Sequence, residues 1–368
     1  MGSLSSPPLS PSRPDQNPAS GFRIFLSFSG RDETTDATLP NWLENYNPCD
    51  NTRGYAGLIP GIPPGHVLKD FSMVALAGFV YVIGGRLCLK EPPSGERDVD
   101  VRPDVVRYDV ESGEWSACAP LALQRFDFAC APCNGKIFVA GGLCSVSNAR
   151  GTTAGEVYDP ARDAWAPLPD MAAMRYKCVG VAWQGRFHVV GGFAQREGAG
   201  WLTVMERSSA EVFDEEQGKW ELVPGMWQLD VPPNQIVEVG GRLFSSGDCL
   251  NSWKGHIETY DGKLNIWSVI ERSQMQQLSS LVAERQEMRR VYLTMAQIGA
   301  HLYFVAGYQS AAGDGEPRSM SVVHAFDTAA GAGEAWGTFE PLMEDGNKEL
   351  CSHCCDPILY INDATPIM

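Results

Sequence analysis

The chain has 368 residues, of which 44% are hydrophobic and 20% are charged, a balance that supplies enough apolar side chains for a globular core. Its formal net charge is −16, so the sequence lacks the concentrated positive surface that nucleic-acid binding requires. No apolar stretch approaches the roughly 18 residues that span a bilayer. We therefore expect no nucleic-acid partner and no membrane association.

The first 20 residues are rich in serine and proline, and we expect a disordered tail ahead of one folded domain at residues 21–368. Gly2 and Ser6 fit the loose pattern for N-myristoylation, but two prolines follow at once and we interpret the match as coincidental. The 11 cysteines are odd in number and irregularly spaced, which favours reduced thiols and a cytoplasmic and/or nuclear protein.

An apolar strand that ends in Gly-Gly recurs along the chain with a period of about 50 residues. Clear copies lie at 79–85, 136–142 and 186–192, degenerate copies at 242–247 and 301–307, and a worn copy at 23–30. After every copy except the worn one come a Tyr-Asp or Phe-Asp pair and a tryptophan, namely Trp115, Trp165, Trp220, Trp267 and Trp336. We expect the glycines where neighbouring sheets crowd, and the aromatic side chains in the wedges between sheets.

The worn N-terminal copy lacks a strand ahead of it, because the tail precedes it directly. Residues 42–52 continue this copy, and Arg53 stands where the other copies carry tryptophan. Residues 350–356 follow the last tryptophan at the spacing of a next innermost strand, so we expect them to complete the first sheet and close the ring. The predicted fold class is all-β, a six-bladed propeller closed by a C-terminal strand.

These Gly-Gly, Tyr/Phe-Asp and tryptophan motifs resemble those of the kelch repeat, and the resemblance covers residues 22–356. The chain is similar to plant F-box/kelch-repeat proteins in particular, although no F-box is visible in the sequence. The resemblance implies a kelch β-propeller that binds protein substrates for a ubiquitin ligase, with an indirect association to the ligase itself. A kelch scaffold or signalling adaptor outside ubiquitin chemistry is the first alternative, and a small-molecule enzyme on a kelch propeller is the second.

Antiparallel strand order places the long loops after the second strand of each blade on the same face as the residues just before each first strand. These loops span residues 86–104, 143–154, 193–209 and 308–322. We expect a ring of solvent-facing arginine and aromatic side chains there, around the mouth of the central channel, as the partner-binding site. The candidate residues are Arg86, Arg125, Phe126, Arg175, Tyr176, Lys177, Arg290, Tyr292 and Tyr308. Such a ring predicts a protein partner with an acidic segment; the alternative is that the arginines hydrogen-bond neighbouring loops.

Cysteine and histidine near the C-terminus form a weaker candidate site. Cys351, His353, Cys354 and Cys355 are metal-competent, but their alternation along a strand favours packed thiols over a zinc site. The copper and iron ligand patterns of enzymatic kelch proteins, a phosphate-binding loop and a nucleophile elbow are all missing from the sequence. His188 lies within a strand and is interpreted as a core residue. We therefore expect a monomer without cofactor, metal or enzymatic activity.

Overall fold

The computed structural model describes residues 22–31, 38–91, 95–147, 150–197, 203–205, 207–228, 232–246, 256–272, 288–310, 319–330, 335–344 and 347–357. Every regular element in these ranges is a β-strand. Across the same ranges, no helix has the length and apolar character needed to cross a membrane. The tail predicted at residues 1–20 lies outside the described residues.

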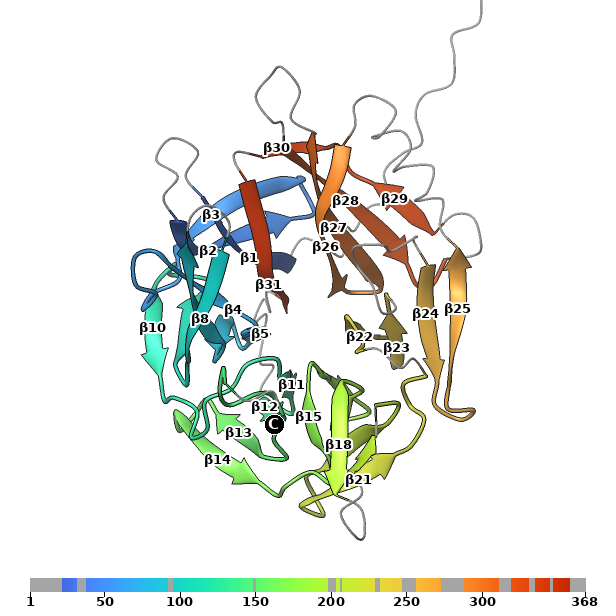
Figure 1. The fold of residues 1–368 in the computed structure, drawn as a ribbon. Helices are drawn as coiled ribbons and strands as arrows, with labels where there is room; N and C mark the ends of the chain where they lie inside the picture. Colours follow the sequence, from blue (N-terminus) through green and yellow to red (C-terminus); the bar gives the residue numbers. More distant parts are fainter. Residues whose placement is uncertain are drawn as a thin grey trace, which may run out of the picture.

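The strands form six principal antiparallel sheets, which we number as blades in chain order and which Figure 1 shows arranged around a central axis. Blade 1 contains β31 (Asn347–Pro357), β1 (Phe22–Arg31), β2 (Thr38–Asn47) and β3 (Thr52–Leu58). Blade 2 contains β5 (Ser72–Leu76), β6 (Phe79–Ile83), β9 (Val105–Asp109) and β10 (Trp115–Cys118). Blade 3 contains β11 (Ala129–Cys133), β12 (Lys136–Ala140), β13 (Gly155–Asp159) and β14 (Ala164–Leu168).

The second half of the chain repeats this arrangement. Blade 4 contains β16 (Val179–Trp183), β17 (Arg186–Val190), β20 (Ala210–Asp214) and β21 (Lys219–Val223). Blade 5 contains β22 (Ile236–Val239), β23 (Arg242–Ser245), β24 (His256–Asp261) and β25 (Ile266–Arg272). Blade 6 contains β26 (Met288–Ile298), β27 (His301–Ser310), β28 (Ser319–Asp327) and β29 (Trp336–Thr338), with β30 (Leu342–Glu344) also paired to β28. The predicted all-β propeller fold is confirmed.

Strand β31 joins the C-terminal end of the described chain to its N-terminal strand. It pairs antiparallel with β1, with Cys354 opposite Phe25 and His353 opposite Leu26. Cys354 is buried and belongs to the same apolar cluster as Phe25. The C-terminal segment therefore completes the sheet of blade 1, as its spacing predicts (Figure 1).

Aromatic side chains fill the wedges between blades. Tyr158 of blade 3 is completely buried, and its ring centroid lies 5.1 Å from that of Trp165 and 5.8 Å from that of Tyr81 in blade 2. Trp165 is half-buried, and its indole N–H donates to the carbonyl oxygen of Ala119 at 2.9 Å. The large flat rings thus bury apolar area between sheets while the one polar atom of the indole stays hydrogen-bonded.

The Gly-Gly pair after the second strand of blades 2, 3 and 4 lies where two blades meet. In blade 3, Gly141 and Gly142 have φ values of 71° and 95°, a region that side chains with a Cβ rarely adopt. A Cβ on Gly141 would lie 2.8 Å from the carbonyl oxygen of Arg175, and one on Gly142 would lie 2.7 Å from the Cβ of Phe128. Both the backbone conformation and the space require glycine, as predicted.

Candidate functional site

The long loops after the second strand fold back on the residues that precede the first strand. In blade 2 they form a three-stranded sheet of β4 (His66–Lys69), β7 (Arg86–Glu91) and β8 (Gly95–Val101), and before blade 4 a similar sheet of β15 (Met174–Tyr176), β18 (Phe193–Glu197) and β19 (Thr203–Met205). Isolated bridges join Phe126 to Leu143 and Thr152 to Arg175. The predicted juxtaposition is confirmed, and we call residues 66–71, 86–91, 95–102, 124–127, 143–147, 150–152, 174–177 and 193–197 the loop face (Figure 1).

Arg125 has no exposed surface on this face. Its Nη2 donates to Glu156 Oε1 at 2.8 Å, and its Nη1 donates to the carbonyl oxygens of Gly141 at 2.8 Å and Ala154 at 2.9 Å. The guanidinium therefore joins the start of blade 3 to its second and third strands.

Arg175 repeats this arrangement in blade 4. It is also completely buried, and its Nε donates to Glu211 Oε1 at 3.1 Å. Its Nη1 donates to the carbonyl oxygens of Gly191 at 3.1 Å and Ser209 at 3.2 Å. The prediction that Arg125 and Arg175 face solvent is wrong, because both guanidinium groups are buried and donate their hydrogen bonds to groups inside a blade. A side chain without exposed surface cannot grip a partner, so the basis for an acidic partner segment is removed at these two positions.

Arg86 lies in β7 and is partly buried. Its Nε donates to Asp70 Oδ2 at 2.5 Å, and its Nη1 bonds Asp98. The guanidinium carbon lies 5.6 Å from the centre of the Phe126 ring, within the range of a cation–π interaction. Arg86 is thus compensated by two carboxylates, and the predicted excess of positive charge is absent at this position.

The aromatic candidates on the loop face differ in exposure. Phe126 is buried and packs with Val101 and Leu143. Tyr176 is half-buried, and its ring centroid lies 5.0 Å from that of Phe193. Tyr176 therefore offers surface to a partner, whereas Phe126 supports the loops from beneath.

The residue two positions before the first strand has the same unusual backbone conformation in blades 2, 3 and 4. Asp70, Asp127 and Lys177 have φ values of 53°, 54° and 52°, in the left-handed region. The backbone N–H of Asp127 donates to the carbonyl oxygen of Asp70 at 3.1 Å, and that of Lys177 donates to the carbonyl oxygen of Asp127 at 2.7 Å. A hydrogen-bonded chain thus steps from blade to blade, and it carries two carboxylates and one exposed lysine in place of the predicted all-positive ring.

Asp127 has a strongly perturbed carboxyl group. Burial, followed by the nearby carboxylate of Asp70, raises its pKa to about 7, while Lys177 and Arg86 act in the opposite direction. The charge of the loop face therefore changes near neutral pH. Asp70 and Asp127 of the loop face were not predicted from the sequence, and neither were Glu156 and Glu211, the third-strand partners of the two buried arginines. For the two glutamates a signal was available, because each stands two positions before the Tyr-Asp or Phe-Asp pair of its blade.

The three candidates from blade 6 lie inside strands and not ahead of the first strand. Arg290 and Tyr292 belong to β26, and Tyr308, which is buried, lies opposite Arg290 in β27. The buried Tyr292 hydroxyl donates to Glu344 Oε1 at 2.7 Å and accepts from Arg53 Nη1 at 3.3 Å. The prediction of a solvent-facing Tyr292 is wrong, since its hydroxyl links blade 6 to blade 1.

Three histidines are buried deeply enough to lose their basicity. Burial lowers the pKa of His188, His324 and His353 to about 4, so their imidazoles are neutral at pH 7. His188 is 3% exposed and bonds the carbonyl oxygen of Arg186, in agreement with its interpretation as a core residue. His353 bonds Thr294 Oγ1 and the carbonyl oxygen of Met295. Among the described residues, no three metal-competent side chains gather; the Cys355 side chain lies outside them.

Comparisons with known proteins agree with the repeat. The family model of the kelch motif matches residues 124–172, which run from the start of blade 3 through its last strand. The chain is 32% identical over 232 residues to F-box/kelch-repeat protein At1g16250 of Arabidopsis thaliana, covering 61% of this chain and 56% of the relative. It is 27% identical over 209 residues to F-box/kelch-repeat protein At1g67480 of the same plant, covering 56% and 50%.

A human protein is also similar. Kelch-like protein 23 is 27% identical over 165 residues, which cover 44% of this chain and 26% of that protein. The chain thus spans about half the length of the Arabidopsis relatives it matches, and less of the human one.

Proposed function

Because the chain is a kelch-repeat β-propeller of the kind found in plant F-box/kelch-repeat proteins, and as such a protein-interaction module, we propose that it recognises protein substrates for a ubiquitin ligase. The partner would bind at the loop face. The observation that carries the proposal is the support of this face by two small sheets: β7 and β18 pair with β4 and β15, the segments ahead of the first strands, and β8 and β19 pair in turn with β7 and β18. Rigid support of exposed loops is the usual construction of a recognition surface.

Tyr176 and Lys177 are the best-placed contact residues. They are adjacent in sequence, Lys177 is exposed and Tyr176 is half-buried against Phe193. Aromatic side chains that are held by packing lose little entropy on binding, and they are enriched among the residues that dominate interface energies. The buried Arg125 and Arg175 hold this surface in shape from below.

The test compares partner capture by the wild-type chain and by a Tyr176→Ala/Lys177→Glu variant. Proximity labelling in cells, followed by quantitative mass spectrometry, should show specific neighbours that the variant loses by at least about tenfold, since each removed anchor costs about 1–3 kcal/mol at an interface. Lys263→Glu is the matched control, because Lys263 is an exposed lysine in the turn between β24 and β25, remote from the loop face. Equal loss in the control, or no loss in the double variant, would remove the loop face as the binding site.

The ubiquitin arm is measured separately. If the proposal holds, a cullin subunit is recovered with the chain, and overexpression of the wild-type chain shortens the half-life of the captured neighbours. The Tyr176→Ala/Lys177→Glu variant should leave those half-lives unchanged. Loss of partners at the loop face without any cullin and without any change in half-life favours the scaffold or adaptor alternative. Ubiquitin ligases of this kind act in the cytoplasm and nucleus, so we propose that localisation for this chain.

A further inference from the structure

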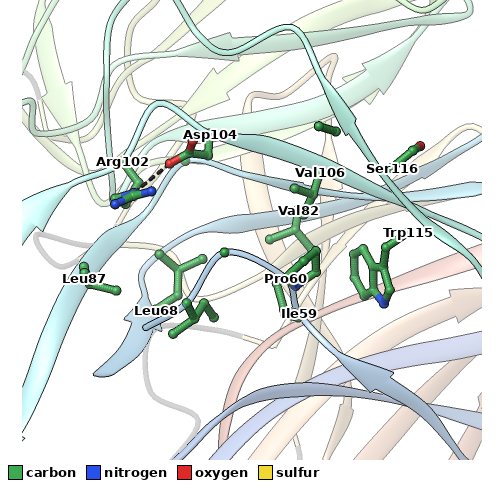
Figure 2. A pocket seen from close by; sticks show the side chains of 14 residues that line it. Ile59, Pro60, Leu68, Val82, Leu87, Arg102, Asp104, Val106, Trp115 and Ser116 are labelled. Carbon is green, nitrogen blue, oxygen red and sulfur yellow. Dashed lines mark hydrogen bonds and ion pairs between the residues drawn. The ribbon is translucent and has the colours of Figure 1, made fainter. Parts of the chain in front are cut away.

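A pocket of about 330 Å³ opens between blades 1 and 2. Figure 2 shows its apolar walls, among them Leu68, Val82 and Val106, with the Arg102–Asp104 pair on one side and Trp115 on the other. This volume lies at the lower end of the range for small-molecule sites. The pocket shares Leu68, Leu87 and Arg102 with the loop face but does not include Tyr176 or Lys177, and the ligand inferred for it is a small molecule, so the inference goes beyond the proposed function.

Blades 3 and 4 show what the repeat places at this position. Val106 of blade 2 occupies the position of Glu156 in blade 3: Val106 pairs with Val82 of the second strand, as Glu156 pairs with Val139. Leu68 lies two residues before Asp70, as Arg125 lies two residues before Asp127 in the same hydrogen-bonded chain. The buried Arg–Glu pair of blades 3 and 4 is therefore replaced by leucine and valine in blade 2. Both replacements line the pocket.

The substitution leaves backbone acceptors without their usual donor. In blade 3, Nη1 of Arg125 donates to the carbonyl oxygens of Gly141 and Ala154. The corresponding residues of blade 2 are Gly84 and Asp104, which also line the pocket and keep the equivalent backbone bond, from Gly84 N–H to the Asp104 carbonyl, at 3.0 Å. Leu68 has no N–H in its side chain, so it cannot take the place of the guanidinium.

The opposite wall includes the side chain of Trp115. The indole Nε1 of Trp115 is buried and has no hydrogen-bond partner among the described residues. The Nε1 of Trp336 in blade 6 is likewise without a partner among the described residues. The equivalent indoles of blades 3, 4 and 5 are bonded, to the carbonyl oxygens of Ala119, Pro169 and Met226: Trp165 at 2.9 Å, Trp220 at 2.7 Å and Trp267 at 2.6 Å. Each uses a carbonyl from the chain that leaves the preceding blade. The worn blade 1 supplies no such acceptor to Trp115, and a buried donor left unpaired is costly.

We propose that this pocket binds a small uncharged molecule with an apolar body and a hydroxyl or amide N–H directed at the Gly84 and Asp104 carbonyls. The apolar walls, with the Trp115 ring among them, fit the body of such a molecule, and the two carbonyls whose counterparts in blade 3 receive a guanidinium fit its donor. A charged ligand is disfavoured, since Val106 replaces the glutamate that would balance a cation and the side chains of Arg102 and Asp104 neutralise each other at 2.6 Å.

The first experiment uses 4-hydroxyacetophenone, which carries a hydroxyl donor and a ketone acceptor at opposite ends of an aromatic ring. The chain contains ten tryptophans, and their indole N–H resonances are followed by two-dimensional NMR during titration. The Trp115 resonance, assigned from Trp115→Phe, should shift and saturate at millimolar probe or below, while those of Trp165, Trp220 and Trp267 stay in place. The anion 4-hydroxybenzoate should bind at least about tenfold more weakly because of its buried charge. No saturable shift at Trp115, or equal binding of the anion, would overturn the proposal.

Variants then separate the pocket from general effects. Leu68→Arg/Val106→Glu rebuilds the ion pair of blades 3 and 4 inside the pocket and should abolish probe binding. Ala117→Trp, at an exposed rim position, should block the entrance if the rebuilt pair impairs folding. Trp115→Phe should keep the wild-type melting temperature, because the donor it removes has no partner, and it should bind the probe about five- to tenfold more weakly, because it removes part of the apolar wall; affinity is measured by fluorescence of the remaining tryptophans or by calorimetry. Trp165→Phe is the matched control: it loses a bond to Ala119, so its melting temperature should fall while its probe affinity stays unchanged. Wild-type affinity in both Trp115→Phe and Ala117→Trp would overturn the assignment.

Discussion

The buried pair of Arg125 and Glu156 makes a sharp test of what stabilises the loop face. In Arg125→Leu, the Glu156 carboxylate, which is 4% exposed, loses its counter-charge. Removing one partner of a buried pair costs about 3–5 kcal/mol. Glu156 still accepts from the backbone N–H groups of Ala122 at 2.8 Å and Leu123 at 3.2 Å, so we expect the lower part of that range, about 3 kcal/mol.

The double variant Arg125→Leu/Glu156→Val should be more stable than the single one. It installs in blade 3 the leucine and valine that blade 2 already carries at Leu68 and Val106, so no buried charge is left alone. The N–H groups of Ala122 and Leu123 then lose their acceptor, at about 1 kcal/mol each, and the double variant should remain about 2 kcal/mol below the wild type. A recovery of about 1 kcal/mol from single to double variant is therefore expected, in spite of the second truncation.

The measurement is the free energy of unfolding in urea, followed by near-ultraviolet circular dichroism and tryptophan fluorescence. Arg162→Leu is the control, because the Arg162 side chain is 82% exposed and its loss should change stability by less than about 0.5 kcal/mol. An Arg125→Leu variant as stable as the control would refute the reasoning, since it would mean that the guanidinium is solvated and free for a partner. A double variant less stable than the single one would refute the role of the unpaired charge.

Three further predictions follow from the backbone and from Asp127. Because burial and Asp70 raise the pKa of Asp127 from 3.8 to about 7, the folded state binds this proton more tightly than the unfolded state. The resulting stabilisation is complete below about pH 4 and is lost as pH rises to about 7. Asp127→Asn should flatten this decline in stability, and an unchanged pH profile of the urea midpoint would contradict the prediction. Gly142→Ala should lower the free energy of unfolding by more than about 2 kcal/mol, because the new Cβ clashes with Phe128 and the backbone keeps a positive φ. Gly135→Ala also has a positive φ, 74°, but its Cβ enters open space, so it should cost about 1 kcal/mol in the same denaturation assay. Truncation before Asn347 removes β31 and leaves an edge of β1 unpaired, so we expect insoluble or unfolded protein; a soluble monomer with an unchanged melting temperature would show that β31 is dispensable.

The repeat made the fold accessible from sequence because its signals are local. The Gly-Gly pair marks the end of a second strand by a backbone conformation that only glycine adopts easily, and the Tyr-Asp and tryptophan motifs mark the third and fourth strands. Even β31, far from β1 in the chain, was predictable, because a worn first copy without a preceding strand needs a partner from elsewhere. Arg290, Tyr292 and Tyr308 were misplaced because β26 and β27 are longer than the corresponding strands of the earlier blades.

The arginines were misplaced for a different reason. A position just before a first strand does not reveal whether its side chain turns outward to solvent or inward to the blade, and Arg125 alone fits either case. What decides the direction is an acidic partner 31 residues later, in the third strand. A comparison of the repeats reveals that partner. In blades 3 and 4 the residue ahead of the first strand is arginine, and the third strand carries Glu156 or Glu211. In blade 2 the corresponding residues are Leu68 and Val106. When a positive residue at one position of the repeat is always accompanied by a negative residue at a second position, and both are replaced together, the two side chains pair with each other inside the blade. The same comparison that moves the arginines from the partner-binding site into the blade also identifies blade 2, where leucine and valine replace the pair, and there the structure has a pocket.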